Sequence, residues 1–325
     1  MFLLIDTGSD ITWIQCDPCP QCYKQQDSLF QPAGSATYKP LPCNSTMCQQ
    51  LQSFSHSCLN SSCNYMVSYG DKSTTRGDFA LETLTLRSDD TILVSVPNFA
   101  FGCGHANKGL FNGAAGLMGL GKSSIGFPAQ TSVAFGKVFS YCLPSVSSTI
   151  PSGILHFGEA AMLDYDVRFT PLVDSSSGPS QYFVSMTGIN VGDELLPISA
   201  TVMVDSGTVI SRFEQSAYER LRDAFTQILP GLQTAVSVAP FDTCFRVSTV
   251  DDINIPLITL HFRDDAELRL SPVHILYPVD DGVMCFAFAP SSSGRSVLGN
   301  FQQQNLRFVY DIPKSRLGIS AFECN

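Results

Sequence analysis

The chain has 325 residues, a formal net charge of -10 and only 15% charged residues. This length is sufficient for two domains of ordinary size, and the composition excludes a coiled coil or a disordered chain. The acidic balance argues against nucleic acid and anionic membrane surfaces as partners, and no stretch approaches the ~20 apolar residues that a membrane span needs.

Short runs of alternating apolar and polar residues recur along the chain, separated by Gly, Asn, Asp, Ser and Pro, and predict antiparallel strands. They lie at 65–69, 79–86, 91–96, 153–157, 182–191 and 306–310. Apolar residues have helical spacing at 214–229, where Pro230 and Gly231 form a stop. The sequence therefore predicts an all-β protein with minor helix.

A Ser- and Pro-rich stretch at 144–152 predicts the junction between two lobes, because a new strand pattern starts directly after it. We therefore expect an N-terminal lobe over 1–152 and a C-terminal lobe over 153–325. A second stretch of this kind, at 174–180, is interpreted as a surface loop.

An internal repeat links the two halves. Leu-Ile-Asp-Thr-Gly-Ser at 4–9 returns as Met-Val-Asp-Ser-Gly-Thr at 203–208. Each copy is followed, about a hundred residues later, by two apolar residues and Gly, at 117–119 and 297–299. One copy alone is typical of a turn after a strand. Two copies in matching flanks indicate a duplicated β domain.

Each copy places an Asp, Asp6 or Asp205, at the end of an apolar run, where an ionised carboxylate needs hydrogen bonds or a chemical role. The Gly permits a tight turn that directs backbone amides at the carboxylate, and the last hydroxyl residue can donate to it. If the two loops face each other, both carboxylates reach one water and share one proton near acid pH. The predicted supporting residues are Thr7, Gly8, Ser9, Ser206, Gly207 and Thr208.

On these motifs the chain resembles the pepsin-like aspartic proteases, specifically their plant nepenthesin-like branch. The match runs over essentially the whole chain and rests on DTGS, DSGT, AGLMGLG, SVLGN and a Cys-rich insertion after the first motif. The resemblance implies a bilobal pepsin-like fold, with two related β-barrel-like lobes and a central cleft. It also implies an endopeptidase that cleaves proteins and extended peptides at acid pH, through a water activated by the Asp6 and Asp205 pair. We expect a monomer without metal or cofactor.

Residues 65–78 resemble the family's flap, a hairpin that closes over the substrate and excludes water. The resemblance assigns Tyr69 as the flap tyrosine, Gly70 and Asp71 as backbone contacts to substrate, and Trp13 as the residue whose indole N–H holds Tyr69. The alternatives are a surface-hairpin tyrosine and a structural core tryptophan. Lys72 departs from the small residue usual in the family, so flap mobility or substrate preference is expected to differ.

Twelve Cys and two glycosylation sequons, at Asn44 and Asn60, favour an oxidising secretory environment. A zinc or iron–sulfur site is the alternative, although ferredoxin spacing would need a Cys in place of Gln26. Sequence alone does not fix the connectivity. Family spacing implies Cys16–Cys19, Cys22–Cys103, Cys43–Cys63, Cys48–Cys58, Cys142–Cys324 and Cys244–Cys285.

Residues 1–5 lack the features of a signal peptide, so we expect the sequence to be N-terminally incomplete, through processing or a truncated gene model. The expected location is the secretory pathway, first the extracellular space or apoplast, with vacuole and plastid as alternatives.

The sequence leaves three alternatives to this function. GLMGLGKS at 116–123 fits a phosphate-binding loop, but Gly126 and Pro128 interrupt the helix that such a loop requires. An inactive xylanase-inhibitor-like binding protein could use the same scaffold, although both Asp motifs and Tyr69 are intact. A truncated chain without function is the third, because missing upstream strands would leave a sheet edge unpaired.

Overall fold

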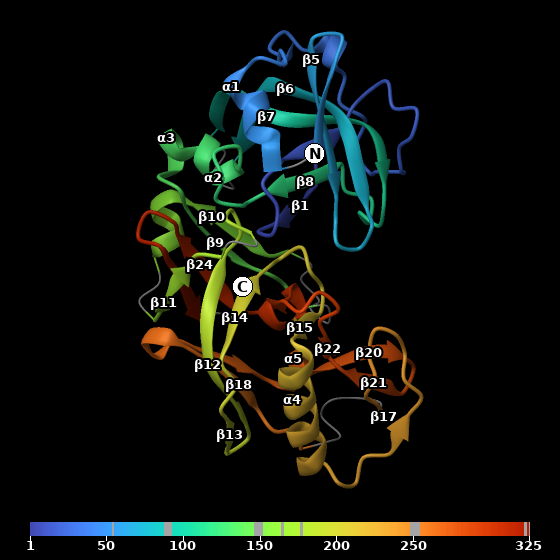
Figure 1. The fold of residues 1–325 in the computed structure, drawn as a ribbon, viewed down its shortest axis with the longest axis vertical. Coiled ribbons are helices and arrows are strands. Elements are labelled where there is room, and N and C mark those ends of the chain that lie inside the picture. The colour runs from blue at the N-terminus through green and yellow to red at the C-terminus, as the bar shows by residue number, and fades with distance from the viewer. Residues whose placement is uncertain are drawn as a thin grey trace. The chain divides into compact units, whose positions relative to one another are not determined.

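The computed structural model describes residues 1–53, 55–87, 93–145, 152–163, 166–175, 178–247, 254–321 and 324. Strands dominate these residues, as the alternating patterns predicted. The chain divides into two compact units, Met1–Gly136 and Lys137–Asn325 (Figure 1).

The boundary between the two units lies between Gly136 and Lys137, earlier in the chain than the lobe junction predicted after residue 152. Strand β9 (Val138–Cys142) pairs with β10 (Ile154–Phe157) and with β24 (Arg307–Asp311), so its backbone belongs to the second unit. Most of the Ser- and Pro-rich stretch lies outside the described residues.

The first unit is built on one sheet, with strand order β1-β8-β2-β7-β6-β5-β4 and β3 paired to β6. Trp13, Tyr65 and Phe79 are fully buried in its core. The strands are β1 (Leu3–Asp6), β2 (Trp13–Gln15), β3 (Lys39–Pro40), β4 (Ser55–Leu59), β5 (Ser62–Ser68), β6 (Thr74–Arg87), β7 (Leu93–Lys108) and β8 (Gly116–Gly119). Its helices are short: α1 (Thr46–Gln49), α2 (Phe127–Gln130) and α3 (Ser132–Phe135).

The second unit has a large sheet, in the order β10-β9-β24-β25-β11-β12-β14-β23-β15-β22 with β13, β18 and β19 attached to it, and a smaller sheet, β16-β17-β21-β20. The further strands are β11 (Arg168–Val173), β12 (Phe183–Val191), β13 (Glu194–Leu196), β14 (Ala200–Val204), β15 (Ser211–Phe213), β16 (Thr234–Ala235), β17 (Cys244–Arg246), β18 (Ile258–Phe262), β19 (Glu267–Leu270), β20 (Leu276–Asp280), β21 (Val283–Phe286), β22 (Phe288–Pro290), β23 (Ser296–Leu298) and β25 (Arg316–Ser320). Its helices are α4 (Gln215–Ile228) and α5 (Pro272–Ile275).

The predicted elements are confirmed wherever the structure describes them. Five predicted strands coincide with β5, β6, β10, β12 and β24, and the strand at 91–96 falls in β7 from residue 93 onward. Residues 91, 92, 176 and 177 lie outside the described part of the chain. Helix α4 occupies the predicted range 214–229 and buries Tyr218, Leu221 and Phe225, because these side chains recur on one face.

The internal repeat appears as the same strand arrangement in each unit. In the first, β1 runs parallel to β8, and β2 pairs antiparallel with β8 and parallel with β7. In the second, β14 runs parallel to β23, and β15 pairs antiparallel with β23 and parallel with β22. The duplicated β domain that the sequence predicted is therefore confirmed.

Six disulfides join all twelve Cys, and two of them, Cys142–Cys324 and Cys244–Cys285, have the pairing that family spacing implied. The other four implied pairings, Cys16–Cys19, Cys22–Cys103, Cys43–Cys63 and Cys48–Cys58, were wrong. The structure has Cys16–Cys103, Cys19–Cys22, Cys43–Cys58 and Cys48–Cys63 instead.

Strand pairing and side-chain direction explain these corrections. Strand β2 runs parallel to β7, and the backbone N–H of Cys16 donates to the carbonyl of Gly104 at 3.0 Å, which brings Cys16 beside Cys103. Cys48 and Cys63 are both buried in the core of the first unit, with 2% and 0% exposure, whereas Cys58 is on the exposed side of its hairpin. The spacing of Cys residues along the chain indicates neither which strands pair nor which Cys side chains point into the core.

The disulfide arrangement predicts the result of peptide mapping. Digestion of the non-reduced protein, followed by mass spectrometry, should yield one cross-linked pair of peptides containing Cys16 and Cys103, and a second pair containing Cys48 and Cys63. Peptides that join Cys22 to Cys103 instead would contradict the pairing that the strands favour.

Candidate active site

Asp6 ends β1 and is held by its own turn. Its carboxylate accepts the backbone N–H of Gly8 at Oδ1, 2.8 Å away, and the hydroxyl of Ser9 at Oδ2, 2.7 Å away. The residue is 6% exposed. Both carboxylate oxygens therefore have a fixed donor, which orients the group without neutralising it.

Asp205 follows β14 and has the same environment. The backbone N–H of Gly207 donates to Oδ1 at 2.8 Å, the hydroxyl of Thr208 donates to Oδ2 at 2.6 Å, and the residue is 7% exposed. The two copies thus hold a carboxylate in the same way in two separate units.

The segment that lies against each turn also recurs. Leu120 N–H donates to the carbonyl of Asp6 at 2.8 Å, and Asp205 N–H donates to the carbonyl of Leu298 at 3.1 Å. Gly119 N–H donates to the hydroxyl of Thr12, and Gly299 N–H to that of Ser211, six residues after the Asp in each copy. The Leu-Met-Gly and Val-Leu-Gly segments of the sequence are therefore the backbone supports of the two turns.

Glycine is required at these supports by close backbone approach. A Cβ on Gly119 would lie 2.3 Å from the carbonyl group of Asp10, and one on Gly299 would lie 2.7 Å from the carbonyl oxygen of Val209. Real Cβ atoms do not approach backbone so closely, so any larger residue would push the support away from the turn. This segment in the first unit, 116–119, is strand β8, and the helix that follows it, α2, has only four residues, whereas a phosphate-binding loop leads directly into a helix whose N-terminus binds phosphate.

Thr7 and Ser206 are buried, with 0% and 6% exposure, and their predicted supporting role stays a prediction. Sequence reasoning missed Asp10, which is 2% exposed and accepts the backbone N–H of Ser123 at 3.1 Å. The corresponding residue of the second copy, Val209, is 53% exposed, so this carboxylate is specific to the first turn. A second Asp four residues after Asp6 was the signal available in the sequence.

The hairpin of β5 and β6 carries the predicted flap residues at its turn. Trp13 is fully buried and its Nε1–H donates to the hydroxyl of Tyr69 at 2.8 Å, the contact that the resemblance implied. Burial, and then the nearby Asp6 carboxylate, raise the pKa of Tyr69, so its hydroxyl keeps its proton. The Asp71 carboxylate accepts both the N–H and the hydroxyl of Ser73, at 2.8 and 2.6 Å.

Lys72 lies in the left-handed backbone region, with φ of 72°, and is exposed. Residues other than Gly adopt this region at a cost of about 1–2 kcal/mol. Gly70 is open on its Cβ side, with no atom within 4 Å of where a side chain would begin. The substrate contacts expected of Gly70 and Asp71 stay predictions.

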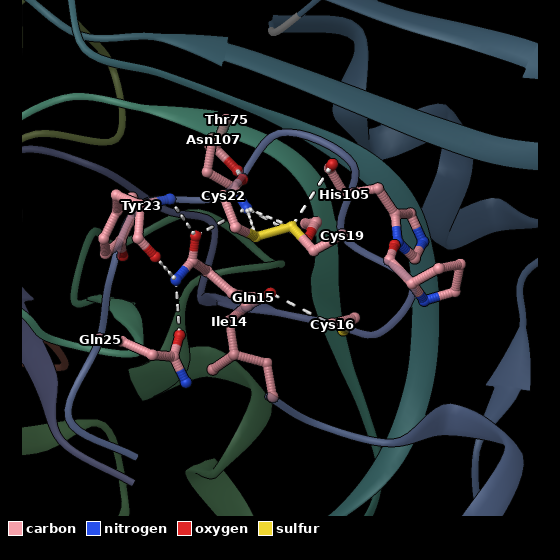
Figure 2. Close-up of a disulfide and its surroundings, with 12 residues drawn as sticks. Ile14, Gln15, Cys16, Cys19, Cys22, Tyr23, Gln25, Thr75, His105 and Asn107 are labelled. Atoms are coloured by element: carbon pink, nitrogen blue, oxygen red, sulfur yellow. Dashed lines mark hydrogen bonds between the residues drawn. A yellow bond between two sulfur atoms is a disulfide. The ribbon is translucent and has the colours of Figure 1, made fainter. Parts of the chain in front are cut away.

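The Cys-rich insertion is tied to the sheet through polar side chains (Figure 2). Gln15 is 0% exposed, and its Nε2 donates to the carbonyl of Tyr23 at 3.0 Å and to Oε1 of Gln25 at 2.6 Å. Asn107 Nδ2 lies 3.5 and 3.8 Å from the sulfur atoms of Cys22 and Cys19. These contacts hold the insertion where it has no apolar core of its own.

His105 joins the same insertion to β6. Its Nδ1 lies 2.9 Å from the carbonyl oxygen of Pro18, and its Nε2 lies 3.2 Å from Oδ2 of Asp78, whose other oxygen accepts from Asn64 at 2.7 Å. Both partners of the imidazole ring accept hydrogen bonds, so only the doubly protonated ring satisfies both. The hydrogen bond with Asp78 accordingly raises the pKa of His105.

The two glycosylation sequons, at Asn44 and Asn60, lie on exposed positions. Asn60 and Ser61 have φ of 50° and 67° and form the turn between β4 and β5, as Asn is suited to do. Among the described residues, no group of three or more His, Cys, Asp and Glu side chains could hold a metal ion. No described helix is both long and apolar enough to cross a membrane.

Two domain models match most of the chain. One, described as xylanase inhibitor N-terminal, matches residues 1–159, and the other, described as xylanase inhibitor C-terminal, matches residues 181–321. Aspartyl protease family protein 2 of Arabidopsis thaliana is 42% identical to this chain. The alignment covers 100% of this chain and 68% of the Arabidopsis protein. Aspartic proteinase nepenthesin-1 of Nepenthes gracilis is 36% identical and aligns with 99% of this chain and 74% of its own.

Solved structures show the same fold. Basic 7S globulin from soybean superposes with a TM-score of 0.78 at 26% identity. The superposition covers 99% of this chain and 89% of the soybean chain. An aspartic proteinase from Irpex lacteus superposes with a TM-score of 0.71 at 17% identity, covering 99% of this chain and 90% of its own. The all-β, pepsin-like fold that the sequence predicted is thereby confirmed.

The close approach at Gly119 predicts a large stability effect for one methyl group. Gly119→Ala should lower the free energy of unfolding by about 1–3 kcal/mol, because the new Cβ meets the backbone of Asp10. Gly231→Ala is the matched control, since nothing lies within 4 Å of its Cβ position, and should change stability by less than about 0.5 kcal/mol. Urea denaturation monitors both, and equal effects would contradict this account.

The contact between His105 and Asp78 predicts pH-dependent stability. Because the folded-state pKa of His105 is raised, its stabilising contribution is complete below the unfolded-state pKa, about 6.5, and is lost as pH rises through the folded-state pKa. His105→Gln should therefore cost about 0.5–1 kcal/mol at pH 5 and progressively less above pH 7. Denaturation curves at several pH values measure this difference.

The double variant provides the control for this pH effect. In the background of Asp78→Asn, the change His105→Gln should lose most of its effect at pH 5, because the charged partner is gone. An unchanged pH dependence in that background would mean that another group is responsible.

Proposed function

The chain belongs to the pepsin-like aspartic proteases, within their plant nepenthesin-like branch, and on this premise we propose that it is an endopeptidase acting on proteins at acid pH. The observation that carries the proposal is the matched pair of carboxylates. Asp6 and Asp205 each receive one backbone N–H and one hydroxyl hydrogen bond, at distances that agree within 0.1 Å between the two copies.

The proposed reaction uses the two carboxylates together. One of them, ionised, takes a proton from a water that attacks the peptide carbonyl carbon, while the other, protonated, donates a hydrogen bond to the carbonyl oxygen. Two interacting carboxyl groups share a proton in aspartic proteases generally, and the apparent pKa values belong to the pair. The fixed donors at each Oδ atom support this division of roles, because they keep the carboxylates oriented as the proton moves.

The flap supports the same proposal. The hydrogen bond from Trp13 to Tyr69 fixes the tyrosine at the base of the hairpin turn, and the raised pKa keeps its hydroxyl neutral. A neutral hydroxyl can donate to a substrate carbonyl and does not add a negative charge near Asp6. We propose that this hairpin closes over the peptide and excludes water from the reacting bond.

The second candidate is a binding protein without peptidase activity. It is favoured by the names of the matched domain models, xylanase inhibitor, and by the likeness to basic 7S globulin from soybean. A protein of that kind has no use for two matched carboxylates with complete hydrogen bonding, and a buried carboxylate retained without a role is costly. The endopeptidase therefore accounts for more of the chain.

We also propose that the protein is secreted and that it acts in the extracellular space. Six disulfides need an oxidising compartment in order to form and persist. Exposed sequons at Asn44 and Asn60 are accessible to glycosylation in the same pathway.

The proposed reaction predicts that both carboxylates are essential. Asp6→Asn and Asp205→Asn should each lower kcat/KM on a denatured protein substrate at pH 3–5 by about a thousandfold or more, because an amide neither accepts nor supplies the required proton. Thermal unfolding of each variant should be nearly unchanged, since Asn preserves the shape of the side chain.

Asp193→Asn is the matched control, because it makes the same chemical change at an exposed position in the second unit. It should leave kcat/KM within about twofold of the parent value. Full peptidase activity in either catalytic variant, or in the parent protein saturated with pepstatin, would rule out the proposed reaction. A correctly folded parent without activity that inhibits a xylanase would favour the binding protein.

A further inference from the structure

We propose that a hollow on the outer face of β5, β6 and β7, beside Arg76 and Lys108, binds a short acidic peptide segment. The hollow has a volume of about 480 Å³. It lies within the first unit and includes neither Asp6 nor Tyr69, so the proposed binding can be measured separately from the proposed hydrolysis. A volume of this size is typical of pockets that hold small ligands or a few side chains.

Strand register brings the two cations to the same face. In the pairing of β6 with β7, Thr74 lies opposite Lys108 and Arg76 lies opposite Ala106. Residues two apart on a strand point to the same side, so Arg76 and Lys108 are diagonal neighbours within reach of one ligand. Met66 lies opposite Arg76 on β5 and adds an apolar side chain, 46% exposed, to the same face.

The positive charge of this face is not balanced by the residues around it. Arg76 and Lys108 are both exposed, and neither forms an ion pair within the described part of the chain. No carboxylate is among the described residues that line the hollow. The Asp71 carboxylate is bound by Ser73, and the Asp78 carboxylate by Asn64 and His105. In a chain with a net charge of -10, such a face attracts an anionic ligand selectively.

The strands that carry the two cations are held by hydrogen bonds on the opposite, buried face of the sheet. Asn107 and Thr75 are 5% and 0% exposed and point inward, and the Thr75 hydroxyl donates to Oδ1 of Asn107 at 2.7 Å. The hydroxyls of Thr75 and Tyr65 are also 2.7 Å apart, and Asn107 Nδ2 donates to the carbonyl of Gly104 at 3.1 Å. Figure 2 shows Asn107 and Thr75 beside the sulfur atoms of Cys22 and Cys19. Strands held in this way do not have to be ordered when a ligand binds.

The combination of charges and apolar surface identifies the occupant as an acidic peptide. Two cations match two or three carboxylates, and the exposed side chain of Met66 matches an apolar residue between them. A long polyanion would gain nothing from Met66 and would be repelled by the rest of this acidic chain. We therefore expect a motif of Glu or Asp residues around one apolar side chain.

The binding is tested with a fluorescein-labelled peptide, Glu-Glu-Leu-Glu-Glu with blocked ends, by fluorescence anisotropy at pH 6.5. All proteins carry Asp205→Asn, so that hydrolysis of the probe does not enter the measurement. The double variant Arg76→Glu with Lys108→Glu should weaken binding by about tenfold or more, and added salt should weaken binding to the parent.

Lys39→Glu with Arg87→Glu is the matched control, because it makes the same change in charge at two exposed residues elsewhere in the same unit. It should change the Kd by less than about twofold. Equal weakening by both double variants would overturn the site, since total charge would then explain binding. Equal binding of Gln-Gln-Leu-Gln-Gln would also overturn it, because the carboxylates would be irrelevant.

Two further arms complete the test. Met66→Ser should weaken binding of the Leu-containing peptide about threefold but should not affect a peptide of five Glu residues. If a polyphosphate of matched charge displaces the peptide at much lower concentration, the site is a general polyanion site and the peptide assignment is wrong. If the charge-reversal variant unfolds, Arg76→Gln with Lys108→Gln replaces it and should still weaken binding severalfold.

Discussion

A carboxylate at the end of a strand is held in one orientation only if the chain folds back onto both of its oxygens. Both halves of this protein meet that requirement with the same turn, in which a glycine amide and a hydroxyl side chain bind the two oxygens of one Asp. Each turn also needs a second strand packed closely against it. That close approach is possible because Gly119 and Gly299 have no side chain. The central strand arrangement of each unit follows from this packing.

In the first unit, polar side chains connect the Cys-rich insertion to the sheet. Gln15, Asn107 and His105 link the Cys-rich insertion to strands β2, β6 and β7, in addition to the apolar side chains of the insertion that are buried in the core of the first unit. The same strands extend into the hairpin that carries Tyr69, so the insertion, the hairpin and Trp13 form one connected structure. A disturbance of the insertion is therefore expected to reach the hairpin through Asn107 and Thr75.

The position of charge distinguishes the two sides of that hairpin. The hydroxyl of Tyr69 is kept neutral near Asp6, whereas the outer face carries Arg76 and Lys108 without bound carboxylates. The proposed acidic segment would dock beside these two cations without touching Asp6.

The sequence by itself determined the strands, the long helix, the duplication and both Asp turns. These features depend on the periodicity of apolar residues and on the positions of glycine and hydroxyl residues, which constrain the backbone over a few neighbouring residues. It also identified Trp13 and Tyr69 through resemblance, and the structure has the hydrogen bond between them. Only the tertiary structure decided the pairing of Cys16 with Cys103 and of Cys48 with Cys63, the burial of Asp10, and the partners of His105. These depend on which strands lie side by side and on which face each side chain points to, and neither is encoded in spacing along the chain.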